Sequence, residues 1–138
     1  AMSLGVLKVK EKQLYFSNAG QPYPIVRQGE KAWQMELNGL PLGCLDEKIC
    51  AELNEEYQSL NINLKKNDFV VFYSDGITEA TDKNDEMYQT ERLLDVVQKI
   101  DLGVSSQEMV DIIINDVAMF VGDVEQYDDM TIIVVRCK

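Results

Sequence analysis

Histidine is absent from this chain of 138 residues, and cysteine is scarce. Without histidine, the protein cannot use Ser-His-Asp or Cys-His catalysis, and no metal site can have a histidine ligand. The three cysteines, Cys44, Cys50 and Cys137, show no Cys-x-x-Cys spacing, so reduced thiols are expected rather than a disulfide or a zinc site. Any bound metal must therefore be held by oxygen atoms, which indicates Mg²⁺, Mn²⁺ or Ca²⁺.

Long apolar runs are also missing, and basic charge is in the minority. No apolar run approaches the roughly 20 residues that span a bilayer, and no signal peptide is visible, so we expect a cytoplasmic protein with no membrane partner. The 24 acidic and 13 basic side chains give a formal net charge of −11, which repels nucleic acid and favours cations or basic partners. With 46% hydrophobic and 27% charged residues, the composition is that of one folded domain.

Residues 69–80 combine a strongly apolar run with a candidate functional residue. The run Phe69-Val70-Val71-Phe72-Tyr73 predicts a buried strand. Ser74-Asp75-Gly76 follows, and we expect a tight turn in which Gly76 adopts a positive φ. Asp75 would then stand at the end of a rigid strand, either as a metal ligand or acid/base group, or as a solvated turn residue.

The rest of the chain reads as strands, then helices, then one closing strand. Helices are expected at residues 90–100, capped by Thr90, and after the N-cap Ser105. This order indicates an α+β fold. Strands are expected at residues 3–10, 13–18, 25–27, 32–37, most of 49–60, and 130–137. The Glu and Leu content of residues 49–60 would also suit a helix. The second helix is expected to bury a broad face made of Met109, Val110, Ile112, Ile113, Val117, Met119 and Phe120.

The last strand is as apolar as the run at residues 69–73, so we expect the two to lie together in the core of the sheet. Antiparallel pairing would bring Asp75 close to Asp128 and Asp129 at one edge. Clustered carboxylates repel one another unless a divalent cation neutralises them. Two interpretations stay open from the residues alone: a metal site at this edge, with Thr131 as a supporting hydroxyl, or separate surface acids.

Five short motifs occur in one order along the chain. They are Asn18-Ala19-Gly20-Gln21-Pro22-Tyr23-Pro24, Gly39-Leu40-Pro41-Leu42-Gly43, Tyr73-Ser74-Asp75-Gly76-Ile77-Thr78-Glu79-Ala80, Glu91-Arg92-Leu93-Leu94 and Asp128-Asp129-Met130-Thr131. In this order the chain resembles the bacterial stress-response and sporulation phosphatases of the PPM (PP2C-like) superfamily, the SpoIIE/RsbU type. The resemblance implies an antiparallel β-sandwich with flanking helices.

The resemblance also implies a metal-dependent protein serine/threonine phosphatase. In such enzymes two Mn²⁺ or Mg²⁺ ions at the sheet edge activate a water molecule against phosphoserine or phosphothreonine. Asp75 and Asp128 match metal-ligand positions of the family, and Asp129 is the neighbour of the second. The partner implied is a phosphorylated anti-anti-sigma (STAS-like) protein, that is, an anti-sigma factor antagonist.

Two departures from the family pattern shape these expectations. The Asp-x-x-Gly-His-Gly segment, whose Asp bridges both metals, is absent, and Gln21 stands where relatives often have His. Residues 1–138 are therefore expected to be the C-terminal part, roughly two-thirds, of one PPM-type domain that is truncated at its N-terminus. Such a fragment should bind metal poorly and turn over little. Because truncation bares a strand edge, we predict that it self-associates as a homo-oligomer or rearranges.

Two other functions stay open. The missing Asp and His also suit a catalytically incomplete pseudo-phosphatase or regulatory protein-binding module. An unrelated acidic α+β domain, in which the carboxylates are ordinary turn residues, is the third hypothesis.

Overall fold

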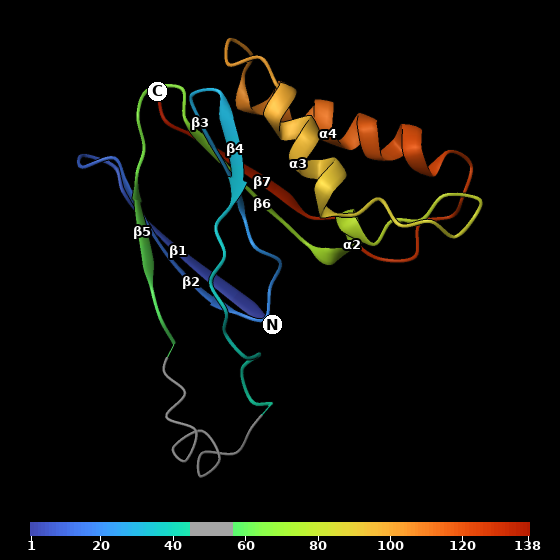
Figure 1. The fold of residues 1–138 in the computed structure, drawn as a ribbon, viewed down its shortest axis with the longest axis horizontal. Helices are drawn as coiled ribbons and strands as arrows, with labels where there is room; N and C mark the ends of the chain where they lie inside the picture. Colours follow the sequence, from blue (N-terminus) through green and yellow to red (C-terminus); the bar gives the residue numbers. More distant parts are fainter. Residues whose placement is uncertain (45–56) are drawn as a thin grey trace. The chain divides into compact units, whose positions relative to one another are not determined.

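The computed structural model describes residues 1–44 and 57–138. Its elements follow the order strands, helices, closing strand (Figure 1), so the predicted α+β class is confirmed. In chain order they are β1 (Met2–Lys8), β2 (Gln13–Ala19), β3 (Ile25–Gln28), β4 (Lys31–Gln34), β5 (Leu60–Asn63), β6 (Phe69–Tyr73), α2 (Asp75–Thr78), α3 (Thr90–Lys99), α4 (Ser106–Val121) and β7 (Ile132–Arg136).

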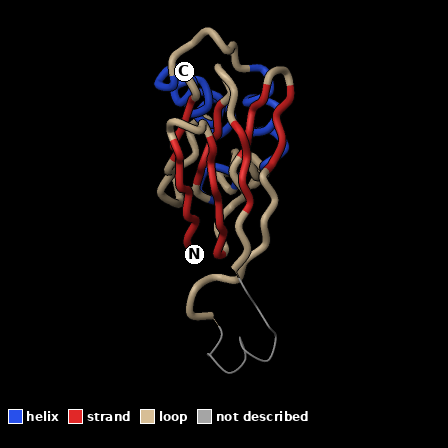
Figure 2. The backbone as a smooth tube through the Cα atoms, turned by 90° about the vertical axis from the view of Figure 1, so that its left-hand side faces the viewer, coloured by secondary structure: helices blue, strands red, loops and turns tan. Residues whose placement is uncertain are grey.

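The first of two compact units comprises Ala1–Tyr23 and Glu36–Leu64. Its described residues form an antiparallel sheet in the order β1-β2-β5. The predicted hairpin of β1 and β2 is confirmed, with the two strands paired along their whole length (Figure 2). In β2, the buried Leu14 and Phe16 alternate with partly exposed polar neighbours, as expected for a strand with one buried face. Every residue of β1, by contrast, is exposed.

The second unit comprises Pro24–Met35 and Lys65–Lys138. Its sheet has the order β4-β3-β6-β7, with all neighbours antiparallel. β6 is an inner strand and is buried along most of its length. The expectation that both apolar strands lie in the sheet core is half right, because β7, like β4, is an outer strand among the described strands, and Ile133 is 56% exposed. An apolar run alone does not distinguish an inner strand from an edge strand.

Helices α3 and α4 pack on one face of this sheet (Figure 1). The core between them contains Ile25, Phe69, Val71, Tyr73, Ile77, Tyr88, Leu93, Val97, Ile100, Met109, Ile113 and Val117. The predicted start of α4 is confirmed: the Ser105 hydroxyl accepts from the Glu108 N–H, and the Glu108 carboxylate accepts from the Ser105 N–H.

Several boundaries and faces differ from expectation. The cap of α3 is Gln89, not Thr90, which is already the first helical residue. The buried face of α4 is narrower than predicted, since Ile112 is 39% and Met119 is 84% exposed. Most of the strand expected at residues 49–60 lies outside the described residues; only its last residue belongs to β5. Within the described residues, no helix has both the length and the apolar character needed to cross a bilayer.

Candidate metal centre

The end of β6 and the start of β7 lie at the same edge of the second unit's sheet. Their antiparallel register pairs Tyr73 with Ile132. Ser74 and Asp75 therefore leave the sheet where residues 128–131 enter it. The pairing predicted from the two apolar runs is confirmed, and it makes two acidic segments that are far apart in sequence into neighbours.

Ser74 links the two segments through hydrogen bonds. Its N–H donates to the Thr131 carbonyl oxygen at 3.0 Å. Its hydroxyl donates to the Asp129 carbonyl oxygen at 3.0 Å and accepts from the Thr131 N–H at 2.9 Å. Three hydrogen bonds thus fix the backbone of the second acidic segment beside Asp75. The position of Ser74 between the strand and the acid is visible in the motif, but its role is not, because its partners lie far away in the sequence.

Gly76 is needed here for close packing and not for a turn. The expected tight turn is wrong, because Asp75–Thr78 form the single-turn helix α2 and Gly76 is not among the glycines with positive φ. A Cβ at Gly76 would lie only 2.6 Å from the Asp129 carbonyl oxygen. Glycine therefore allows the first turn of α2 to touch the backbone that leads into β7.

The three predicted ligands, Asp75, Asp128 and Asp129, are all exposed. One oxygen of Asp75 accepts from the Gly76 N–H at 3.1 Å, and one oxygen of Asp128 accepts from the Asp129 N–H at 2.7 Å. Carboxylate oxygens suit hard cations such as Mg²⁺. Within the described residues, however, no three Asp, Glu, Cys or His side chains are grouped closely enough to hold a metal ion. The donor type fits the metal and the ligand set is incomplete, so metal binding by these three residues stays a prediction.

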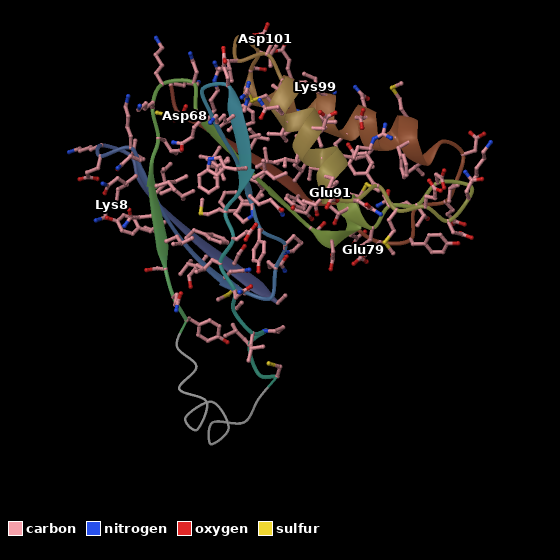
Figure 3. All side chains as sticks on the ribbon, viewed as in Figure 1. Lys8, Asp68, Glu79, Glu91, Lys99 and Asp101 are labelled. Atoms are coloured by element: carbon pink, nitrogen blue, oxygen red, sulfur yellow. The ribbon has the colours of Figure 1, made fainter. Side chains whose placement is uncertain are left out.

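A pocket of about 90 Å³ adjoins this edge. It is lined by the segment from Gly76 to Thr81 and by residues between the end of α4 and the start of β7. Its lining includes the apolar residues Ala80, Val121 and Met130 and the carboxylates Glu79, Glu125 and Asp128. Glu79 lies directly after α2 (Figure 3). No local sequence pattern marks this pocket, because its two sides are about forty residues or more apart in the chain and only the fold brings them together.

The loop on one side of the pocket is anchored to the helix pair through Tyr88. The Tyr88 hydroxyl and the Arg92 Nε both donate to Asp116, at 2.7 and 3.0 Å. The Arg92 guanidinium also lies 5.3 Å from the Tyr88 ring centre and 4.9 Å from that of Phe120. Burial raises the pKa of Tyr88, and its hydrogen bond to Asp116 adds to this. Burial alone would raise the pKa of Asp116, but the bonds from Arg92 and Tyr88 outweigh it and lower that pKa.

A family model described as Stage II sporulation protein E (SpoIIE) matches residues 1–138. The chain belongs to the SpoIIE family. The resemblance inferred from the five motifs is thereby confirmed, and the family is one of PP2C-type phosphatases.

Relatives of this SpoIIE-family chain are longer than it. Stage II sporulation protein E of Priestia megaterium is 26% identical over 140 residues, which cover 99% of this chain and 22% of that protein. The structure of the PP2C phosphatase domain and a fragment of the regulatory domain of SpoIIE from Bacillus subtilis matches with a TM-score of 0.78 at 20% identity. That match covers 97% of this chain and 36% of the other. The chain thus spans well under two thirds of these relatives' lengths.

Two further solved structures carry a metal in their descriptions. The SpoIIE phosphatase domain from Bacillus subtilis, presoaked with Mn, matches with a TM-score of 0.71 at 18% identity, over 98% of this chain and 55% of the other. RsbX in complex with magnesium matches with a TM-score of 0.58 at 16% identity, and the match covers 96% of this chain and 53% of the other. These likenesses support the fold of two antiparallel sheets with helices.

Two other motifs of the SpoIIE-family chain meet inside the first unit. Asn18 is only 3% exposed, and its amide donates to the carbonyl oxygens of Gln21 and Leu37 at 2.9 and 3.1 Å. A Cβ at Gly39 would lie 1.8 Å from the Asn18 carbonyl oxygen. Backbone packing therefore explains the Asn18 and Gly39 motifs. Gln21, which replaces the expected His, is partly exposed and is held here through its backbone groups.

Proposed function

We propose that the protein containing this chain is a metal-dependent protein serine/threonine phosphatase. Its substrate would be a phosphoserine or phosphothreonine on a regulatory protein, a phosphorylated anti-anti-sigma (STAS-like) protein. The observation that carries the proposal is the β6–β7 pairing, which sets Asp75 beside residues 128–129 at one sheet edge. Membership of the SpoIIE family supports the reaction class.

The proposed cofactor is Mn²⁺ or Mg²⁺, with two ions in a complete domain, because related structures were soaked with Mn or hold magnesium. Asp75 and Asp128 would be ligands, with Asp129 beside them. Ions held there would stabilise phosphoryl charge and supply hydroxide near neutral pH. The chain's own contribution is positional: Ser74 and Gly76 hold the two acidic segments against each other. We propose that residues 1–138 are the C-terminal part of the domain and that its remaining part supplies the bridging Asp.

The test is Asp75→Asn in the full-length protein. Loss of one carboxylate ligand should reduce Mn²⁺-dependent hydrolysis of a phosphoserine protein by on the order of 100-fold. Titration calorimetry should show weaker Mn²⁺ binding in the same variant. The matched control is Asp85→Asn, an exposed acid in the loop before α3, which should leave both measurements unchanged. Unchanged activity in Asp75→Asn would refute the ligand assignment.

A pseudo-phosphatase or regulatory binding module is the second candidate. It is favoured by the absence, among the described residues, of three grouped metal-binding side chains. An Asp-x-x-Gly-His-Gly segment upstream in the same polypeptide supports the enzyme. Its absence there, together with substrate binding but no turnover in saturating Mn²⁺, supports the binding module.

A further inference from the structure

The pocket beside α2 has the size of a site for an extended side chain. Its volume is about 90 Å³. Pockets for small-molecule ligands are several times larger, roughly 300–1,000 Å³. Ala80, Val121 and Met130, all partly buried against the core, supply apolar surface that can contact methylene groups.

The same pocket carries uncompensated negative charge. Glu79 and Glu125 line it and are exposed, and neither forms an ion pair within the part of the chain that the structure describes. None of the described residues that line the pocket is a lysine or an arginine. The neighbouring segment, residues 122–129, contains four acids and no basic residue. An occupant with positive charge would therefore be attracted, and an acidic one repelled.

An exposed aromatic ring completes the rim. Tyr127 lines the pocket and is 89% exposed. A ring of this kind attracts the ammonium of lysine or the guanidinium of arginine through its face. Long basic side chains combine an apolar stem with a charged head, so one side chain can use the apolar lining, the two glutamates and the ring together.

We propose that this pocket, the flanking-residue pocket (Glu79, Ala80, Val121, Glu125, Tyr127 and Met130), binds a lysine or arginine of the phosphoprotein that lies close to the phosphorylated residue. The stem packs on the apolar lining, and the head forms charge-assisted hydrogen bonds with Glu79 and Glu125. Gly76 and Asp128 line the same pocket, so it adjoins the candidate metal centre. The inference rests on the proposed function for the identity of the ligand as substrate.

The test uses phosphoserine peptides that place lysine, or the uncharged norleucine, at successive positions on either side of the phosphoserine. With the full-length protein and Mn²⁺, lysine at one position should raise kcat/KM about fivefold over norleucine, the effect of a partly exposed ion pair. The change should lie in KM, and added salt should reduce it. Equal rates for lysine and norleucine at every position would overturn the inference.

Paired variants separate the pocket from general electrostatic attraction. Glu79→Gln with Glu125→Gln should abolish the preference for lysine. The control, Asp123→Asn with Glu86→Gln, removes the same charge from exposed acids of the same two loops that do not line the pocket. It should keep the preference. A loss of the preference in both pairs would overturn the inference in favour of a diffuse acidic surface.

Direct binding distinguishes failure of this inference from failure of the proposed function. Fluorescence anisotropy of the same labelled peptides in EDTA measures affinity without turnover. Lysine peptides should bind about fivefold more tightly than norleucine peptides, and the Glu79/Glu125 pair of substitutions should remove the difference. If the peptides are not hydrolysed with Mn²⁺ but still bind with this preference for lysine, the phosphatase proposal is refuted and the pocket is supported. Hydrolysis without a preference for lysine in either assay would support the phosphatase and refute the pocket.

Discussion

Gly76 has a hydrogen atom where every other residue type has a Cβ. We therefore expect alanine to destabilise the fold at this position, although alanine usually stabilises a helix relative to glycine. Elsewhere in a helix, Gly→Ala stabilises by about 1 kcal/mol. Here the added Cβ would lie 2.6 Å from the Asp129 carbonyl oxygen. We predict that Gly76→Ala lowers the free energy of unfolding by about 1–3 kcal/mol, as overpacking does, measured by urea denaturation.

Gly103→Ala is the matched control for that measurement. A Cβ at Gly103 would meet only the Asp101 carboxylate, at 3.1 Å, and that exposed side chain can move. The change in unfolding free energy should stay within about 0.5 kcal/mol. Equal stability of Gly76→Ala and the wild type would show that the backbone of residues 128–129 moves away at no cost. The close contact between Gly76 and the Asp129 backbone would then not be needed to hold the candidate metal centre in place.

Asp116 on α4 contacts residues outside its own helix, and we expect the stability of the folded protein to depend on pH through these contacts. Its pKa is lowered in the folded protein by the bonds from Arg92 and Tyr88. A carboxyl group with a lowered folded pKa contributes stability above its unfolded pKa, near 3.9, and loses it as the pH falls through the folded value. We predict that part of the stability present at neutral pH disappears below about pH 4, in thermal melts followed by circular dichroism.

Asp116→Asn should test this assignment. The variant should be less stable by about 1 kcal/mol at pH 7, and its melting temperature should fall less steeply below about pH 4. Asp111→Asn on the same helix removes the same charge from an exposed site, where the carboxylate accepts a hydrogen bond from Gln107. It should keep the wild-type pH profile. A wild-type profile in Asp116→Asn would contradict the role given to Asp116.

The sequence predicted those features of the elements that depend on local pattern. The apolar runs identified β6 and β7, and Ser105 with Glu108 identified the start of α4. The pairing of β6 with β7 was predicted from those runs, and antiparallel geometry then brings Asp75, after one strand, beside Asp128 and Asp129, before the other.

Apart from the β6–β7 pairing, features made by contacts between distant segments could not be predicted. Asp75-Gly76 has the sequence of a tight turn, yet it forms the start of helix α2 and packs against the backbone at Asp129. Ser74 acts through partners more than fifty residues away. The exposure of Ile133 depends on which strand ends the sheet, and local hydrophobicity carries no information about that.

At the scale of the whole molecule, β1 is the strand from which we predict self-association. Among the described strands, β1 is one of the two outer strands of the β1-β2-β5 sheet, and it is exposed along its full length. On one face, Met2, Leu4 and Val6 are 47%, 55% and 49% exposed. An exposed apolar edge strand is a template for pairing with another chain. We predict concentration-dependent self-association of residues 1–138 in sedimentation velocity experiments.

Val6→Lys should weaken that association, because a charge on an edge strand opposes pairing between chains. Met119→Lys is the matched control: it places the same charge on α4, at a methionine that is 84% exposed, and should leave the association unchanged. Equal weakening by both substitutions would point to general charge repulsion instead of strand pairing. A monomer at all concentrations for the unsubstituted chain would end the proposal, and the exposed face of β1 would then be tolerated in water without a partner strand.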